Sequence, residues 1–150
     1  MERATLDDVE NFLTLEQKVS DQRTYSAMAE RTDAEKEIET NVVYLIKKDE
    51  AVVGSIAYQI KSEVHAYLSG LVIDPEYQGI GLGREALKRV LEELEPMERI
   101  DLVTHPENTP ALELYLSLGF EVESKKENYY GDGEPRLVLV KTRDSGKPVV

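Results

Sequence analysis

The stretch Gln78-Gly-Ile-Gly-Leu-Gly83 carries a glycine at every second position, and the run Arg84-Glu-Ala-Leu-Lys-Arg-Val-Leu91 that follows it predicts the first turns of a helix. Glycines leave the backbone amides uncovered, because they have no Cβ. The unpaired N–H groups at a helix N-terminus and the positive end of the helix dipole favour an anion, most often a phosphate. The stretch is therefore either an anion-binding turn or a plain surface turn, and the surrounding sequence must decide between them.

The segments around this loop alternate between strand and helix patterns. Runs rich in β-branched residues predict strands, and Lys47-Lys-Asp-Glu50 separates the first two as the turn of an antiparallel hairpin. Thr109-Pro110 predicts a helix start with proline at its favoured first position, and Gly119 predicts its end. In chain order we expect helical segments at 6–19 and 22–40, strands at 42–46, 51–60 and 65–73, a helix at 82–94, a strand at 100–104, a helix at 109–118, and strands at 120–126 and 135–142.

Two capping patterns refine the N-terminal helices. Thr5 with Asp8 three residues later predicts the start of the first helix. Thr32-Asp-Ala-Glu35 predicts a second capping box, which would divide the weakly apolar 22–40 segment in two. We expect a single domain over residues 1–150, with a frayed tail at 144–150.

Composition limits the possible functions. The chain has 150 residues, and its 30 acidic against 18 basic residues give a formal charge of -12, which argues against a nucleic-acid partner. No apolar run is long enough for a membrane span, and no secretory signal is visible, so we expect a cytoplasmic protein without a membrane partner. The absence of Cys excludes disulfides and thiol catalysis, and two His without ligand spacing argue against a metal site.

A dinucleotide-binding loop is one alternative for the glycine stretch. Gly81-Leu-Gly-Arg-Glu-Ala86 satisfies the loose pattern G-x-G-x-x-A, with Asp101 downstream. In that fold the glycines turn directly off the strand, whereas here Asp74-Pro-Glu-Tyr77 intervenes. The antiparallel hairpin before the loop and the single helix pattern after 82–94 also leave no room for the parallel sheet that such a fold needs. These features disfavour the dinucleotide interpretation.

From residue 66 to residue 141 the chain resembles the GNAT superfamily of acetyl-CoA-dependent N-acetyltransferases. The first block of the resemblance is Leu71-Val-Ile-Asp-Pro-Glu-Tyr-Gln-Gly-Ile-Gly-Leu-Gly83, which contains the family signature Q/R-x-x-G-x-G/A. The second block is Asn108-Thr-Pro-Ala-Leu-Glu-Leu-Tyr-Leu-Ser-Leu-Gly-Phe120. Within the family the sequence is most similar to the ribosomal-protein and N-terminal (peptide α-amine) acetyltransferases. The resemblance implies an α+β fold, with a mixed, mostly antiparallel sheet that splays between the strands at 65–73 and 100–104.

The resemblance also implies an acetyl-CoA site. The backbone of Leu71, Val72 and Ile73 would follow the pantetheine arm, and the loop would surround the pyrophosphate through Gln78, Gly79, Ile80, Gly81, Leu82, Gly83 and Arg84. Asn108 would contact the cofactor, and Tyr115 would protonate the leaving thiolate. The spacing is compatible with this, because residues seven apart lie two turns apart on one side of a helix. A phenol with a reference pKa of about 10 is protonated at neutral pH.

The general base of the resembled family is missing. In the branches that this sequence resembles, Glu or His commonly stands five residues before the Asn, where this chain has Val103. His105 and Glu107 are the nearest titratable substitutes, and Tyr129 or Tyr130 could order a water instead. The segment Glu127-Asn-Tyr-Tyr-Gly-Asp-Gly133 resembles the loop that borders the peptide groove in those branches, although Gly-Asp-Gly is a strong turn signal in any protein.

The missing base bears on the acceptor. At pH 7, deprotonating a Lys amine costs about 4.6 kcal/mol and deprotonating an α-amine costs roughly 1 kcal/mol, so an α-amine needs less help from a base. We therefore expect acetyl transfer to a peptide or protein N-terminus by direct attack in a ternary complex, in a monomer or homodimer. Two alternatives stay open. One is acetylation of a small amine such as a polyamine or amino-sugar, and the other is an acyl-CoA-binding module without catalysis.

Overall fold

One seven-stranded sheet, in the order β1-β2-β3-β4-β5-β7-β6, forms the centre of the structure. The structure is a computed structural model that describes residues 1–19 and 30–143. The strands are β1 Glu2–Arg3, β2 Val42–Lys48, β3 Ala51–Ile60, β4 His65–Ile73, β5 Arg99–Thr104, β6 Glu121–Lys126 and β7 Arg136–Thr142. The helices are α1 Val9–Lys18, α2 Arg31–Thr40, α3 Leu82–Glu93 and α4 Thr109–Ser117, with 3-10 turns η1 at Leu6–Asp8 and η2 at Pro75–Tyr77. All strand pairs are antiparallel except β4 with β5, so the expected mixed α+β fold is confirmed.

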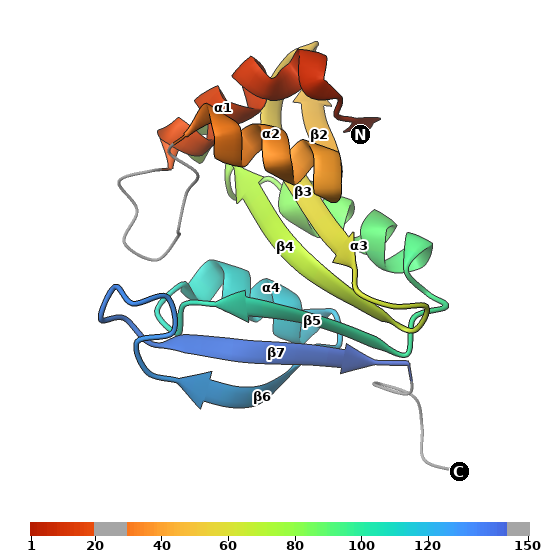
Figure 1. Cartoon of the computed structure of the whole chain (residues 1–150), viewed down its shortest axis with the longest axis vertical. Coiled ribbons are helices and arrows are strands. Elements are labelled where there is room, and N and C mark those ends of the chain that lie inside the picture. The colour runs from red at the N-terminus through yellow and green to blue at the C-terminus, as the bar shows by residue number, and fades with distance from the viewer. Residues whose placement is uncertain (20–29, 144–150) are drawn as a thin grey trace.

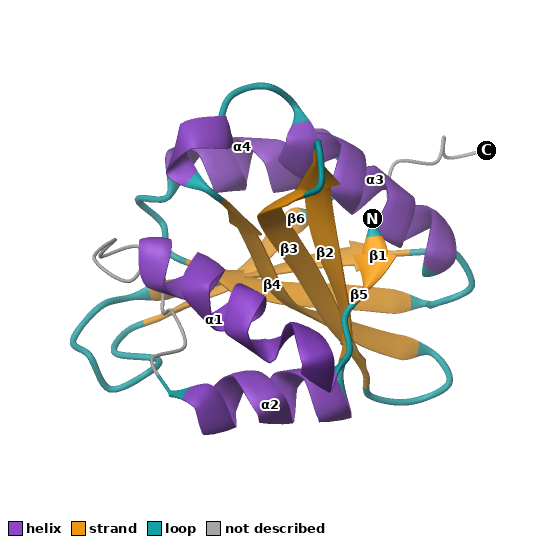
Figure 2. Ribbon diagram, turned by 90° about the horizontal axis from the view of Figure 1, so that it is seen from above, coloured by secondary structure: helices purple, strands orange, loops and turns teal. Residues whose placement is uncertain are grey.

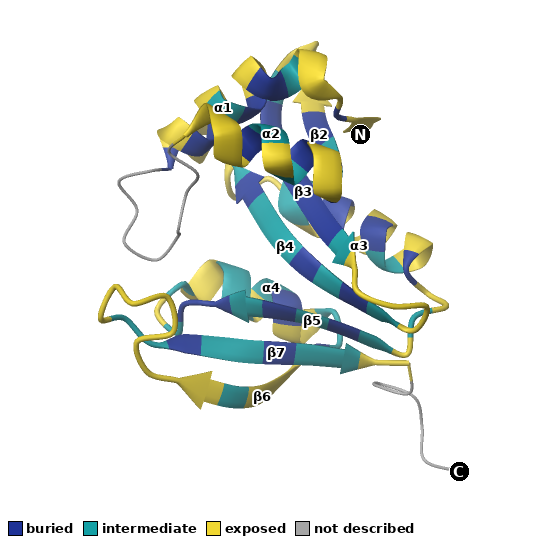
Figure 3. Ribbon diagram, in the orientation of Figure 1, coloured by how far each residue is buried: buried dark blue, intermediate teal, exposed yellow. Residues whose placement is uncertain are grey.

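The helices form a layer on each face of the sheet (Figure 2). On one face, α1 and α2 bury Phe12, Ala34 and Ile38 against β2 and β3. On the other face, α3 buries Leu87 and Val90 against the sheet. The inward sides of the helices are buried and their outer sides exposed (Figure 3), as expected for amphipathic helices. No helix in the described ranges is both long and apolar enough to cross a membrane.

Most of the expected elements are present, and three differ. The strand predicted at 65–73 has those bounds, whereas the two-residue strand β1 was not predicted. The hairpin prediction is confirmed with a tighter turn, in which Asp49 and Glu50 take φ of 51° and 70°. The prediction that Thr32 caps a helix is wrong, because α2 begins at Arg31 with Glu30 as its N-cap. The parts of the expectations that fall on 20–29 and 144–150 lie outside the described residues.

The sheet splays between β4 and β5, as expected. The parallel pairing joins His65, Ala66 and Tyr67 to Arg99, Ile100 and Asp101. Beyond these three pairs the strands separate, which is visible as the widening space between them in Figure 1. The rest of β4 therefore has its hydrogen-bonded partner on the β3 side, and its other edge faces the opening.

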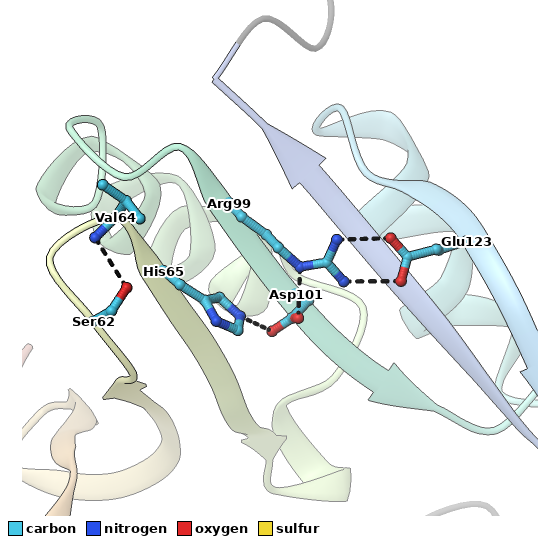
Figure 4. A network of polar contacts seen from close by, with 6 residues as sticks. All are labelled: Ser62, Val64, His65, Arg99, Asp101 and Glu123. Carbon is cyan, nitrogen blue, oxygen red and sulfur yellow. Dashed lines mark hydrogen bonds and ion pairs between the residues drawn. The ribbon is translucent and has the colours of Figure 1, made fainter.

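A polar network holds the closed end of this splay (Figure 4). His65 Nε2 lies 2.9 Å from Asp101 Oδ1, and Arg99 Nε donates to Asp101 Oδ2 at 2.9 Å. The Arg99 guanidinium also donates to both carboxylate oxygens of Glu123 on β6, at 2.7 and 2.8 Å. These hydrogen bonds hold the pKa of the Glu123 carboxyl below its usual range. The network connects β4 to β5 and β6 where the two halves of the sheet meet.

Gly54 on β3 is required for the close approach of β3 to β4. A Cβ at this position would lie 2.7 Å from Val72 O and 2.9 Å from Ile73 Cδ1. We expect Gly54→Ala to lower the free energy of unfolding by about 1–3 kcal/mol, because a backbone carbonyl has to move. Urea denaturation measures the change. Gly83→Ala in α3 is the matched control, since its Cβ would meet Ile73 Cγ1 at an ordinary 3.6 Å and should cost nothing. Equal stability of the two variants would contradict the prediction.

Candidate active site

A cavity of about 390 Å³ opens where β4 and β5 separate. It collects residues from β4, from the loop before α3, from β5 and from α4. Among the residues predicted for the site, those that line it are Leu71, Val72, Ile73, Gln78, Gly79, Gly81, Leu82, Gly83, Arg84, His105, Asn108, Tyr115 and Tyr130. Ile80 and Tyr129 do not line the cavity, and their exposed fractions are 56% and 44%. The structure thus brings most of the predicted site residues together and leaves these two at the surface.

The glycine loop needs glycine for its backbone conformation. Gly79 and Gly81 have φ of 83° and 88°, the left-handed region that other residues rarely adopt. Gly81 is the N-cap of α3, so the free amides of the first helical turn follow it. A Cβ at either position would meet nothing within 4 Å, so the loop surface is open. This geometry suits a phosphate bound at the helix N-terminus.

Two side chains fix the loop to the end of β4. Gln78 Nε2 donates to the carbonyl oxygen of Ile73 at 3.0 Å. Asp74 accepts from the Glu76 amide at 3.0 Å and from Lys18 Nζ, at the end of α1, at 2.7 Å. The hydrogen bond from Lys18 lowers the pKa of the buried Asp74 carboxyl. The loop is therefore anchored to both β4 and α1.

Helix α4 places Tyr115 inside the cavity wall. Asn108 is the N-cap of α4, and both residues line the same cavity. Tyr115 is buried, with its ring edge toward Phe120 at 5.8 Å between centroids. Burial raises the pKa of the Tyr115 hydroxyl above its ordinary value. The hydroxyl consequently stays protonated at neutral pH, as a proton donor requires.

His105 is buried, and one of its ring nitrogens is engaged by the backbone. The amide of Glu107 donates to His105 Nδ1 at 3.0 Å, and His105 Nε2 lies 3.6 Å from Glu134 Oε2. Because Nδ1 accepts a hydrogen bond, the neutral ring carries its proton on Nε2. The lone pair that a base needs is thus directed at the loop backbone. This arrangement suits holding the loop better than taking a proton from a substrate.

Sequence reasoning missed several polar residues of the cavity. Tyr67 and Ser69 of β4, Thr104 at the end of β5 and Arg136 at the start of β7 all line it. Burial and a hydrogen bond with Tyr130 raise the pKa of Tyr67. The Arg136 guanidinium is buried and lies 5.0 Å from the Tyr130 ring centroid. The alternation of Tyr67 and Ser69 with the apolar Ala66 and Leu68 was the sequence signal that could have identified the two β4 residues.

No metal centre is evident in the described part of the chain, where no three His, Asp or Glu side chains are grouped as ligands.

Comparison with known proteins places this geometry in a family. The [Ribosomal protein bS18]-alanine N-acetyltransferase of Escherichia coli strain K12 is 35% identical over 79 residues, which cover 50% of this chain and 53% of that relative. The chain thus spans about half the length of the curated relatives it matches.

Solved structures share the fold over a larger part of the chain. The ribosomal-protein-S18-alanine N-acetyltransferase from Escherichia coli matches with a TM-score of 0.80 and 25% identity, over 99% of this chain and 97% of that one. A GNAT family acetyltransferase from Elizabethkingia anophelis with acetyl-CoA bound has the same fold, with a TM-score of 0.68 and 16% identity over 75% of this chain and 83% of that one.

The sequence model of the Acetyltransferase (GNAT) family matches residues 7–120, which is more than half of the sequence. The glycine loop and α4, which form much of the cavity wall, lie within this range. The chain belongs to the GNAT family of acetyltransferases.

Proposed function

We propose that the protein transfers an acetyl group from acetyl-CoA to the α-amine of a peptide or protein N-terminus. The observation that carries the proposal is the set of groups that line one cavity. An open glycine loop at a helix N-terminus, the unpaired edge of β4 and the buried Tyr115 all line it, and so do Tyr67 and Tyr130. Two substrates held side by side in such a cavity can react without a covalent enzyme intermediate.

The residues present fit acetyl-CoA. The amides that follow Gly81, together with Arg84, would hold the pyrophosphate, and the backbone edge of β4 from Leu71 to Ile73 would bond the amide-rich arm. Arg84 Nη1 donates to Ser117 Oγ at 2.9 Å, which positions its charge beside the loop. Acetyl-CoA supplies the acetyl group as a thioester. An amide of the β4 edge would polarise the thioester carbonyl, and Tyr115 would deliver a proton to the departing sulfur.

Two observations support an α-amine as acceptor. One curated relative and one solved structure carry names that describe acetylation of a ribosomal-protein alanine, which is a property of those proteins. In addition, Val103 lines the cavity, and a valine side chain cannot accept a proton. Removing a proton from an α-amine at neutral pH costs less free energy than removing one from a lysine amine. The α-amine therefore suits this site better than a side-chain amine.

An acceptor panel tests the proposal. We expect CoA release from acetyl-CoA with peptides that have a free N-terminus, and no release when the same peptides are Nα-acetylated, even if they contain lysine. Polyamines and amino-sugars complete the panel as the small-amine alternative. Turnover confined to small amines would refute the peptide acceptor, and CoA binding without turnover on any amine would indicate a binding module.

Tyr115→Phe tests the proton donor. Removing the hydroxyl should lower kcat by about 10²–10⁴ while leaving the Kd for CoA unchanged. Since burial raises the pKa of Tyr115 above its ordinary value of about 10, the hydroxyl remains a donor at all pH values below that, and the deficit should be equal from about pH 6 to about pH 9. Tyr44→Phe is the control, because the Tyr44 hydroxyl bonds Glu93 outside the cavity. Full activity of Tyr115→Phe at every pH would exclude the role.

Gly81→Ala tests the phosphate loop. Alanine in the left-handed conformation costs about 1–2 kcal/mol. Because the loop of the variant needs this conformation to bind CoA, we expect the affinity for CoA, measured by calorimetry, to fall roughly 5- to 30-fold. Gly133→Ala is the matched control, because Gly133 has φ of 79° and equally open space around its Cβ but does not line the cavity. Equal loss of CoA affinity in both variants would contradict a specific role for the loop.

A further inference from the structure

Ser69 of β4 lines the cavity and is hydrogen-bonded to two side chains on the α2 side of the sheet. Its Oγ donates to Glu37 Oε1 of α2 at 2.7 Å. Asn41, which follows α2, donates from Nδ2 to the same Oγ at 3.4 Å. Because the oxygen accepts from Asn41, the hydroxyl proton points to Glu37. A serine hydroxyl has two lone pairs, so one remains for a ligand in the cavity.

The position of Ser69 in the strand supports a functional role. Leu68 and Gly70 pair with Tyr58 and Ala57 of β3, and Ser69 is left out of the register as a bulge. Bulges redirect side chains and are common beside active sites. Ser69 lies two residues before Leu71, where the β4 edge proposed for the acetyl-CoA arm begins, and Tyr115 lines the same cavity from α4.

Asn41 is buried beside the Ser69 hydroxyl. Its side chain is 9% exposed, and within the described ranges Asn41 Oδ1 is buried without a hydrogen-bond partner. A buried oxygen without a hydrogen-bond partner costs free energy, so such atoms are uncommon in native proteins. In this protein the unsatisfied oxygen belongs to the Asn41 amide, whose Nδ2 donates to Ser69 Oγ.

We propose that Ser69 and Glu37 form a proton relay for the acceptor amine, in place of the titratable side chain absent at Val103. This inference rests on the proposed acetyl transfer. An N–H bond of the substrate ammonium breaks and its proton passes to Ser69 Oγ, while the Ser69 hydroxyl proton passes to the Glu37 carboxylate and later to solvent. The freed lone pair forms the N–C bond as the thioester C–S bond breaks. The nitrogen releases its second proton to solvent, Tyr115 gives its hydroxyl proton to the sulfur, and the tyrosinate regains a proton from solvent, so that one proton is released overall.

Glu37 is placed to accept that proton. Its side chain is partly exposed, and Ser69 is its side-chain hydrogen-bond partner among the described residues. Helix α2 packs against α1, β2 and the η1 turn. Several ionisable groups of these elements are engaged elsewhere: Glu10 pairs with Arg31, Asp8 accepts from Thr5, Lys18 pairs with Asp74, Lys47 pairs with Glu2, and the Tyr44 hydroxyl donates to Glu93. Glu16 is buried in α1, and Asp7 and Lys48 are exposed. On β4, His65 pairs with Asp101 and Tyr67 bonds Tyr130.

The test is the pH dependence of kcat/KM for Glu37→Gln and Ser69→Ala with a peptide α-amine. Without the relay, only amine that is already neutral can react, and its fraction falls tenfold per pH unit below a pKa of about 8. We expect a loss of about 100-fold near pH 6 that shrinks toward the unaltered protein near pH 9. The double variant should lose no more than either single variant, because the two groups act as one unit.

Glu39→Gln is the matched control, since Glu39 is an exposed glutamate on the same helix and should give an unchanged profile. The Kd for CoA and the thermal midpoint should be unchanged in Glu37→Gln, which separates a relay from misfolding. A loss equal at every pH, or no loss, overturns the relay while the proposed function stands. The same pH-dependent deficit on an amine other than a peptide α-amine supports the relay and overturns only the proposed acceptor. Absence of turnover on any amine overturns both.

Discussion

Three residues of β4, His65 to Tyr67, pair with β5, and beyond them the two strands run apart. The ion pairs of Arg99 hold this junction closed, so the separation occurs at the other end. There the β4 edge loses its neighbour and exposes backbone donors and acceptors that a continuous sheet would satisfy internally. An extended, amide-rich ligand can replace the missing strand, and the cavity lies at this place.

The two helical layers supply different chemistry to this opening. Helices α3 and α4 provide the glycine loop at a helix N-terminus and the buried Tyr115 hydroxyl, both suited to an anionic thiol ester. On the opposite face, α2 provides Glu37 behind Ser69. In the proposed reaction a proton donor and a proton acceptor thus approach the cavity from opposite sides of the sheet. Their separation fits a transfer in which one proton is removed from nitrogen and another is given to sulfur.

Much of the fold was predictable because its signals are local. The strand predicted at 65–73 and the helix predicted at 82–94 depend on neighbours within a few residues, and both were confirmed. Strand β1 has two residues, too few for any period, and it exists because β2 offers it an edge. The start of α2 was misplaced at Thr32 because a capping pattern competes with packing, and Ala34 and Ile38 must both reach the core of the α1 and α2 layer.

The sequence by itself determined the family resemblance, the glycine loop and the seven-residue spacing of Asn108 and Tyr115, because each depends on a short continuous stretch. Tertiary structure alone decided the burial and the hydrogen-bond partners of the titratable groups. His105 stood near the expected base position in sequence, yet folding buries it and turns Nδ1 to a backbone amide. Glu37 and Ser69 are 32 residues apart and meet only when α2 packs over the sheet. The physical reason is that the proton affinity and accessibility of a side chain depend on burial and hydrogen-bond partners, which distant segments supply.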